Sequence, residues 1–157
     1  MLKKPALGFG KYFNPCIDCK IFLLSEAKKM MPKLGASFLV TGEVVGQRPM
    51  SQRRDTLRVI ERDSGCEGIL VRPLCAKNLE PTQAERDGLI DREQLYAFSG
   101  RNRTPQMKLA DQFGINDYPS PAGGCILADP ILSARIQEYY KKNKRIVPAD
   151  ILLLMVG

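Results

Sequence analysis

The sequence predicts an α/β protein with a parallel sheet in its first half and a more helical second half. Two short apolar runs, Ser37–Thr41 and Gly68–Arg72, are typical of strands, and an amphipathic segment lies between them. Strand, helix and strand in this order favour a right-handed parallel crossover. The length of 157 residues suits one domain, with residues 1–75 as the strand–helix–strand portion and residues 76–157 as the mainly helical portion.

The first helix should begin at Asn14-Pro15, because Asn is a favoured cap and Pro suits the first helical position. Pro32 should end or kink this helix, and Gly35 can close it. Its apolar stripe is Ile17, Ile21, Leu24 and Met31.

The amphipathic segment between the strands predicts a second helix over Ser51–Asp63, with Leu57 and Ile60 facing inward and Gly65 as its stop. We predict further helices over Asp91–Phe98, Thr104–Phe113 and Pro130–Lys142, the last one capped by Asp129. The apolar run Ile151–Val156 should pack on another part of the protein.

Composition and charge limit the function classes. A net charge of +7 favours a polyanionic partner such as RNA or DNA, although basic proteins can also use such charge for solubility alone. No run approaches the ~20 apolar residues of a membrane span, and the first residues lack a secretory signal, so we expect a cytoplasmic protein without a membrane partner. The absence of histidine excludes Ser-His and Cys-His nucleophile pairs and histidine metal sites.

Three cysteines are the strongest candidates for chemistry. Cys16 and Cys19 are three residues apart at a predicted helix N-terminus, where unpaired N–H groups favour the reactive thiolate form. Cys125 follows a Pro-Ala-Gly-Gly turn that lets the backbone approach a ligand closely. Three cysteines without histidine suit an iron–sulfur cluster with one open iron, or a persulfide cysteine with a resolving partner. The alternative is that these cysteines are merely half-buried.

The two remaining cysteines, Cys66 and Cys75, have different sequence surroundings. Cys75 follows an apolar strand and is typical of a small core residue, whereas Cys66 is undecided. Either could supply a fourth ligand to a zinc site.

A polar segment after the first strand is a candidate phosphate-binding loop, since ligands of α/β sheets bind beyond the carboxyl ends of the strands. The alternative is a solvated helix face with a polar loop. The candidate nucleotide-binding residues are Thr41, Gly42, Glu43, Gln47, Arg48, Ser51 and Gln52, and the candidate RNA-binding residues are Arg53, Arg54, Arg101 and Arg103.

Taken together, three motifs resemble those of the PP-loop ATP pyrophosphatases that thiolate tRNA, in a branch similar to the tRNA 2-thiouridylases. The motifs are Asn-Pro-Cys-x-x-Cys at 14–19, Val-Thr-Gly-Glu-Val-x-Gly-Gln-Arg-Pro-Met-Ser-Gln at 40–52, and Tyr-Pro-Ser-Pro-Ala-Gly-Gly-Cys at 118–125. The likeness extends from about Gly8 to the end of the chain.

This resemblance implies a Rossmann-like, adenine nucleotide α-hydrolase-like domain, of which the chain would be the later half. It implies that ATP adenylates a tRNA base and that sulfur, from a donor protein or sulfide, replaces the activated oxygen. Cys16, Cys19 and Cys125 would then be ligands of a [4Fe–4S] cluster or sulfur carriers, and Thr41-Gly42 would lie near the nucleotide.

One departure from the family is that the Ser-Gly-Gly-x-Asp-Ser loop for the ATP pyrophosphate does not occur in these 157 residues. We therefore expect a partial domain, which binds ATP and Mg²⁺ only when a missing half, or a separate chain, supplies that loop. Two other functions stay open: a basic RNA-binding module with a structural zinc, and a redox protein that uses Cys16 and Cys19 as a dithiol.

Overall fold

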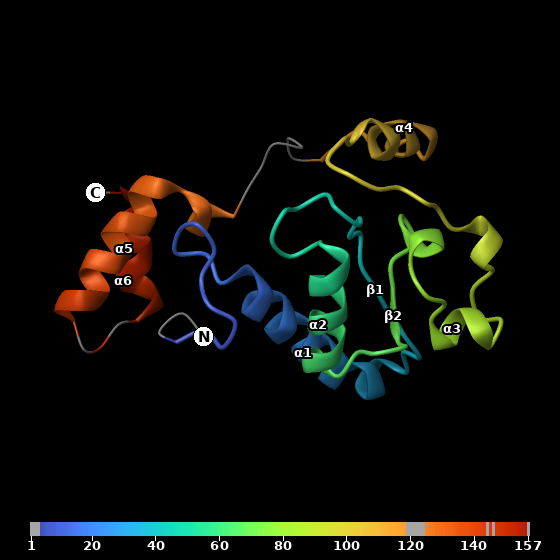
Figure 1. Cartoon of the computed structure of the whole chain (residues 1–157), viewed down its shortest axis with the longest axis horizontal. Helices are drawn as coiled ribbons and strands as arrows, with labels where there is room; N and C mark the ends of the chain where they lie inside the picture. Colours follow the sequence, from blue (N-terminus) through green and yellow to red (C-terminus); the bar gives the residue numbers. More distant parts are fainter. Residues whose placement is uncertain (1–3, 119–124, 144, 146, 157) are drawn as a thin grey trace. The chain divides into compact units, whose positions relative to one another are not determined.

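The computed structural model describes residues 4–118, 125–143, 145 and 147–156, and is mixed α/β with about half of its residues in helices (Figure 1). It divides into two compact units. We call residues 1–18 and 120–157 unit 1, and residues 19–119 unit 2. Unit 2 therefore holds most of the first predicted portion together with the start of the second.

Unit 2 is built on two short parallel strands, β1 (Leu39–Val40) and β2 (Leu70–Val71). Leu39 N–H donates to the Ile69 carbonyl at 2.8 Å, and Thr41 N–H donates to the Val71 carbonyl at 3.0 Å. The predicted parallel pair is confirmed. The predicted strands of five residues are too long, because the Arg72 carbonyl already accepts from Cys75 N–H at 3.0 Å and turns the chain away.

The helices α1 (Cys16–Leu34) and α2 (Arg54–Ser64) follow the predicted signals closely. Pro32 lies inside the last turn of α1, and the helix ends two residues later at Leu34, directly before Gly35 with its left-handed φ of 61°. The stop of α2 is as predicted: Gly65 has a left-handed φ of 67°, which suits glycine, and its N–H donates to the last turn.

The start of α2 corrects the prediction, because the helix begins at Arg54 rather than Ser51. The reason is a turn that engages the backbone of the preceding residues. Gln52 N–H donates to the Arg48 carbonyl at 3.2 Å, and the Gln52 carbonyl accepts from Gly46 N–H at 2.7 Å.

The rest of unit 2 consists of short helical turns, namely η1 (Ala76–Asn78), α3 (Gln83–Arg86) and η2 (Arg92–Gln94), and of α4 (Thr104–Gln112). The predicted helix Asp91–Phe98 is wrong beyond η2. Tyr96 and Phe98 instead donate their N–H groups to the Pro73 and Leu74 carbonyls, both at 2.8 Å.

The interior of unit 2 combines apolar packing with a buried ion network. Leu57, Ile60 and Leu70 are almost fully buried, as the amphipathic pattern predicted for the two α2 residues. Arg72, whose side chain is 1% exposed, pairs with Glu43 at 3.0 Å and with Glu61. Lys20 reaches the other oxygen of Glu43 at 3.2 Å.

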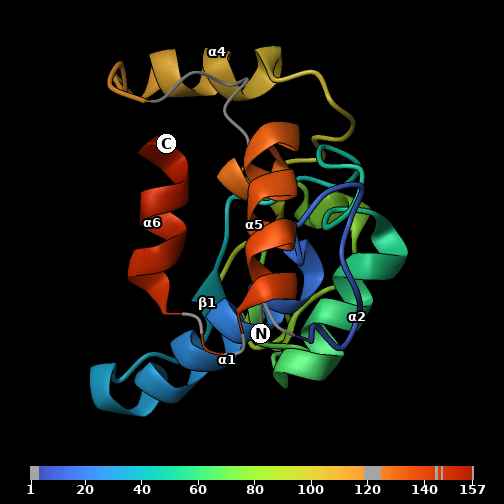
Figure 2. The same cartoon turned by 90° about the vertical axis from the view of Figure 1, so that its left-hand side faces the viewer.

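Unit 1 contains the chain before Cys19 and three later elements, η3 (Ile126–Ala128), α5 (Pro130–Lys142) and α6 (Pro148–Val156). Asp129 caps α5 as predicted, since its carboxylate accepts from Leu132 N–H at 2.8 Å. Helices α5 and α6 lie side by side (Figure 2). Among the described residues, no helix combines the length and apolarity that crossing a bilayer requires.

The core of unit 1 is a small apolar cluster of Phe13, Leu132 and Ile136. Phe13 stacks on Phe9 with ring centroids 4.5 Å apart and tilts against Tyr140 at 5.2 Å. Ile151 and Leu154 of α6 pack against the cluster, so the apolar C-terminal run does find a packing partner.

Candidate functional site

The N-terminal end of α1 presents Cys16 as its first residue and Cys19 almost one turn later, and both are half-buried. Asn14 Nδ2 donates to Cys16 Sγ at 3.5 Å. An amide donor therefore faces this sulfur, at the end of the helix where the positive end of the macrodipole lies. This end of the helix therefore suits a reactive or metal-binding sulfur.

Asn14 is held in place by its own backbone and side chain. Its carbonyl accepts from Gly10 N–H at 3.1 Å and from Cys16 N–H at 2.9 Å. Its Oδ1 accepts from Tyr12 N–H at 3.2 Å, which leaves Nδ2 to face the cysteine sulfur. These hydrogen bonds of Asn14 hold the backbone before α1 and orient the Asn14 side-chain amide toward Cys16.

Asp18 ties the N-terminal segment to the same helical turn. Its carboxylate accepts from Ala6 N–H at 2.7 Å and from Leu7 N–H at 3.1 Å. These two donors compensate part of the negative charge that an acid beside the cysteines would otherwise add.

Cys125 is exposed and lies directly before η3, where its carbonyl accepts from Ala128 N–H at 2.8 Å. The Gly-Gly pair before it, at 123–124, falls outside the described residues.

Ser133 of α5 joins the chain near Cys16 to the chain near Cys125. Its Oγ accepts from Phe13 N–H at 3.2 Å and donates to the Leu127 carbonyl at 2.9 Å. Phe13 is three residues before Cys16, and Leu127 is two residues after Cys125. One buried hydroxyl therefore holds both cysteine-bearing segments of unit 1.

No metal centre is preassembled within the described parts of the chain, since no three Cys, Asp or Glu side chains there form a ligand group. The predicted sharing of one site by Cys16, Cys19 and Cys125 therefore stays a prediction.

Cys66 and Cys75 are core residues of unit 2, each with no measurable exposure. Cys75 Sγ donates to the Glu43 carbonyl at 3.2 Å, and Cys66 Sγ lies 3.7 Å from the carbonyls of Leu24 and Ser64. Burial raises the pKa of the Cys75 thiol, which disfavours its thiolate. Cys75 was predicted as core, and the undecided Cys66 proves to be core as well.

The loop after β1 is held mainly by internal contacts. Thr41 Oγ1 donates to Glu43 Oε2 at 3.3 Å, and Glu43 is buried in its pairing with Arg72. Gly42 and Arg48 are exposed and Gln47 is half-buried, so these three remain open to a ligand. Close to them, Val45 pairs with Ser99, and Gly100 N–H donates to the Val45 carbonyl at 2.8 Å.

Ser51 and Gln52 are both buried in the turn before α2. Gln52 Oε1 has no hydrogen-bond partner among the described residues. A buried amide oxygen without a partner is costly, so this position would gain from a donor such as a ligand hydroxyl or a water molecule.

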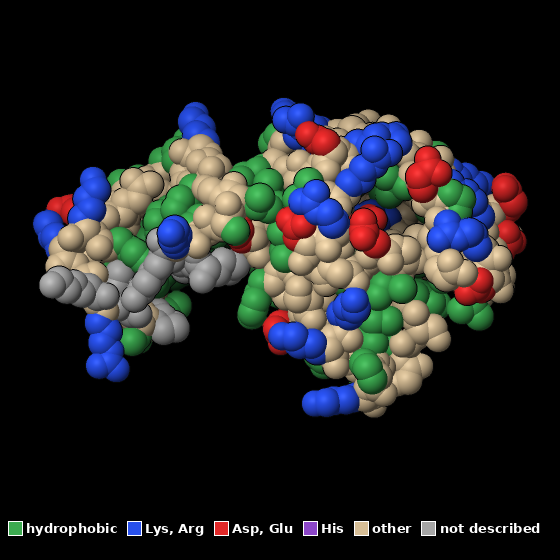
Figure 3. All heavy atoms as spheres, turned by 60° about the horizontal axis from the view of Figure 1, so that its bottom comes forward, with side chains coloured by type: hydrophobic (Ala, Val, Ile, Leu, Met, Phe, Trp, Pro, Cys, Tyr) green, Lys and Arg blue, Asp and Glu red, His purple; other side chains and the backbone are tan. Residues whose placement is uncertain are grey.

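The four arginines predicted to bind RNA differ in their surroundings. Arg53 pairs with Asp55 at 3.0 Å, whereas Arg54, Arg101 and Arg103 have no carboxylate partner within the described ranges. The face shown in Figure 3 carries Lys and Arg side chains spread between acidic and apolar ones, rather than one continuous basic patch.

No family model, curated protein or solved structure matches the chain.

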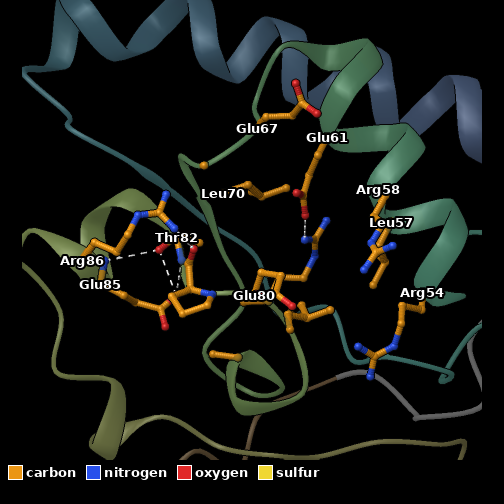
Figure 4. A pocket seen from close by; sticks show the side chains of 15 residues that line it. Arg54, Leu57, Arg58, Glu61, Glu67, Leu70, Glu80, Thr82, Glu85 and Arg86 are labelled. Atoms are coloured by element: carbon orange, nitrogen blue, oxygen red, sulfur yellow. Dashed lines mark hydrogen bonds and ion pairs between the residues drawn. The ribbon is translucent and has the colours of Figure 1, made fainter.

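Sequence reasoning missed a pocket of about 390 Å³ in unit 2, between α2 and the segment from η1 to α3 (Figure 4). The position of Arg72 was the available signal, because an arginine directly after the buried strand residues Leu70-Val71 must find an acceptor or a cavity. The charged residues that line the pocket are Arg54, Arg58, Arg72, Arg86, Glu61, Glu67, Glu80 and Glu85.

Proposed function

We propose that the chain is part of a tRNA-thiolating enzyme in which Cys16, Cys19 and Cys125 provide the reactive or ligating sulfurs. The observation that supports this most directly is the Ser133 bridge, which holds the segments bearing Cys16 and Cys125 in one compact unit. The Asn14 amide donor and the positive end of the helix dipole also lie at the Cys16 sulfur, where a ligating or reactive sulfur carries negative charge.

The donor set fits an iron–sulfur cluster. Clusters are held by cysteine thiolates, the chain has no histidine, and the three cysteines are exposed or half-buried while the other two are sealed in the core. A [4Fe–4S] cluster bound by three cysteines would supply an open iron for sulfur. Asn14 would stabilise the Cys16 thiolate, and Ser133 would position both segments.

The remaining parts of the proposal concern nucleotide and RNA. Under it, the parallel β1–β2 pair belongs to the later half of a Rossmann-like sheet, and the open loop residues after β1 approach the nucleotide. ATP and Mg²⁺ would bind once a Ser-Gly-Gly-x-Asp-Ser loop is supplied by another segment or a separate chain. The partner-free arginines, Arg54, Arg101 and Arg103, would contact tRNA phosphates, which is their preferred chemistry.

Anaerobic reconstitution of the chain with iron and sulfide tests the cysteine assignment. We expect a broad cluster absorbance that is lost in Cys16→Ala, Cys19→Ala and Cys125→Ala. Cys66→Ala and Cys75→Ala serve as matched controls, because their sulfurs are buried in the core of unit 2. They should lower stability and keep the absorbance.

Three outcomes would contradict the proposal. Full absorbance in all three variants would remove the cysteine site. Stoichiometric zinc without iron after anaerobic purification would favour a zinc-stapled RNA-binding module. A reversible Cys16–Cys19 disulfide without any metal, together with no binding of tRNA, would favour a thiol redox protein.

A further inference from the structure

The pocket of unit 2 has a floor and two walls that come from different elements. Gly68, Leu70 and Arg72 line it and alternate along the chain through β2, so they belong to one face of that strand. Figure 4 shows Leu57, Arg58 and Glu61 reaching in from α2 on one side and Thr82, Glu85 and Arg86 lying on the other. Its volume of about 390 Å³ lies within the range of small-molecule sites.

The α2 wall of the pocket is cationic. Arg54 and Arg58 are four residues apart on the helix, both line the pocket, and neither has a carboxylate partner within the described residues. Like charges at this spacing destabilise a helix slightly. An anionic group bound between the two guanidinium groups would relieve that repulsion, and arginine matches phosphate geometry well.

Arg72 adds an unused donor beside this wall. Its Nε and Nη1 are engaged by Glu43 and Glu61, but the buried Nη2 has no partner among the described residues. A buried donor left unpaired is costly, so an acceptor in the pocket would be favoured at this position.

The carboxylates of the pocket fall into two kinds. Glu61 is paired with Arg72, and Glu85 with Arg92. Glu67 and Glu80 are exposed and form no ion pair in the part of the chain that the structure describes. An ionised carboxylate only accepts hydrogen bonds, so these two groups can accept from a ligand that carries N–H donors.

Besides Thr82 and a further cationic side chain, Arg86, the lining includes apolar side chains that suit a flat ring. Leu57, Leu70, Leu79 and Pro81 all line the pocket. We propose that this pocket binds a nucleoside monophosphate whose base carries an exocyclic amino group, with the phosphate on Arg54 and Arg58 and the amino group on Glu67 or Glu80. The site uses none of the cysteines, so it goes beyond the proposed sulfur chemistry and can be tested separately from it.

Calorimetric titration of the full chain with CMP, GMP, UMP and inorganic phosphate tests this site. We expect CMP and GMP to bind about tenfold more tightly than UMP, because only they offer an amino group to a carboxylate. Inorganic phosphate should bind more weakly still. Arg54→Ala and Arg58→Ala should each weaken CMP by about tenfold or more, as expected for a lost charge-assisted hydrogen bond.

Arg62→Ala is the matched control. Arg62 is an exposed arginine of the same helix that pairs with Asp63 and does not line the pocket, so CMP binding should be unchanged. Glu67→Gln and Glu80→Gln, separately and together, should reduce the preference of CMP over UMP. Because all these positions are exposed, we expect every variant to fold. A thermal melt of each variant checks this.

Several results would overturn the site. These are no binding of any nucleotide, equal affinity for CMP, UMP and phosphate, or binding that persists in the Arg54→Ala/Arg58→Ala double variant. A short cytidine oligonucleotide separates the two sources of the same chemistry. If it binds with the same arginine dependence and displaces CMP, the site is supported and also accepts a nucleotide within RNA.

Discussion

The two compact units are built around opposite kinds of interior. In unit 2 a charged network of Arg72, Glu43 and Glu61 lies beside the apolar core, with the first two side chains at most 3% exposed. In unit 1 the centre is the apolar cluster of Phe13, Leu132 and Ile136, and its one buried polar side chain, among those described, is Ser133.

The two interiors should be sensitive to different kinds of substitution. Taking charges out of water is expensive, and the cost is offset only while every partner is present. Unit 2 should therefore respond most to the loss of one charge, whereas unit 1 should respond to lost apolar volume. Four substitutions test whether the two interiors respond in these different ways.

The largest effect should come from Arg72→Met. It leaves Glu43, which is 3% exposed, with only the partly exposed Lys20 as a charged partner. Removing one partner of a buried pair costs about 3–5 kcal/mol. Urea unfolding should show this loss, and hydrogen exchange should rise in the amides of 39–45 and 54–72.

The companion variant for this prediction is Arg72→Met/Glu43→Gln. Because it neutralises the stranded carboxylate, it should recover part of the lost free energy of unfolding. If Arg72→Met alone stays within about 1 kcal/mol of the original protein, an ordinary value for a point mutation, the network is not what holds unit 2.

Ile136→Ala should cause the next largest loss of stability, and the loss should occur in unit 1. Ile136 is fully buried in the cluster, and removing such a side chain costs about 2–4 kcal/mol through lost burial and the cavity left behind. Hydrogen exchange of the α5 amides reports the change. Ile131→Ala lies on the same helix but is 65% exposed, so a similar loss there would contradict the assignment of the core.

Segments within unit 2 differ in how well sequence reasoning anticipated them. The α2 boundary at Gly65 and the apolar strands are encoded locally, by a residue that tolerates positive φ and by short apolar runs. The segment Asp91–Phe98 is different, because its backbone bonds go to Pro73 and Leu74, about twenty residues away along the chain. No local sequence pattern predicts such long-range hydrogen bonds.

The same limit applies to the candidate sites. The helix start at Cys16 was predictable from Asn14-Pro15, and Cys75 was predicted as core from its apolar neighbours. The hydrogen bond between Phe13 and Ser133 joins residues that are 120 positions apart in the sequence. The charged residues of the pocket, between Arg54 and Arg86, are each typical of a solvated surface when considered singly. Only tertiary packing brings them together.

Ser133→Ala probes the one buried polar bridge of unit 1. It would leave Phe13 N–H and the Leu127 carbonyl without their shared partner. The cost should be about 1–2 kcal/mol, mostly from the buried donor left unpaired. Exchange at the amides of 13–16 should rise, and cluster loading in the reconstitution assay should fall. Unchanged loading with faster exchange would show that the bridge stabilises the unit without serving the cysteines.

Glu85→Gln should have the smallest effect, because glutamine can keep the hydrogen bonds of Glu85 and the charged partner that it leaves, Arg92, is partly exposed. Glu85 completes a capping box with Thr82 at the start of α3 and pairs with Arg92. Burial raises the pKa of Glu85, but the hydrogen bonds from Thr82 and the Arg92 guanidinium outweigh it and hold this pKa below its ordinary value of 4.5.

The lowered pKa fixes the sign of the pH dependence for Glu85. A carboxyl with a lowered pKa contributes stability above its unfolded-state pKa and loses it as the pH falls through the folded-state value. Glutamine can keep the Thr82 bonds but not the charge, so we expect a loss of about 1 kcal/mol at pH 7.

Urea unfolding from pH 7 to pH 3 measures this loss. The difference between the two proteins should shrink below pH 4.5. Glu138→Gln is the control on an exposed pair with Lys142 and should change stability less at every pH. A Glu85→Gln difference that grows on acidification would mean that burial of the Glu85 carboxylate outweighs its pairing with Thr82 and Arg92.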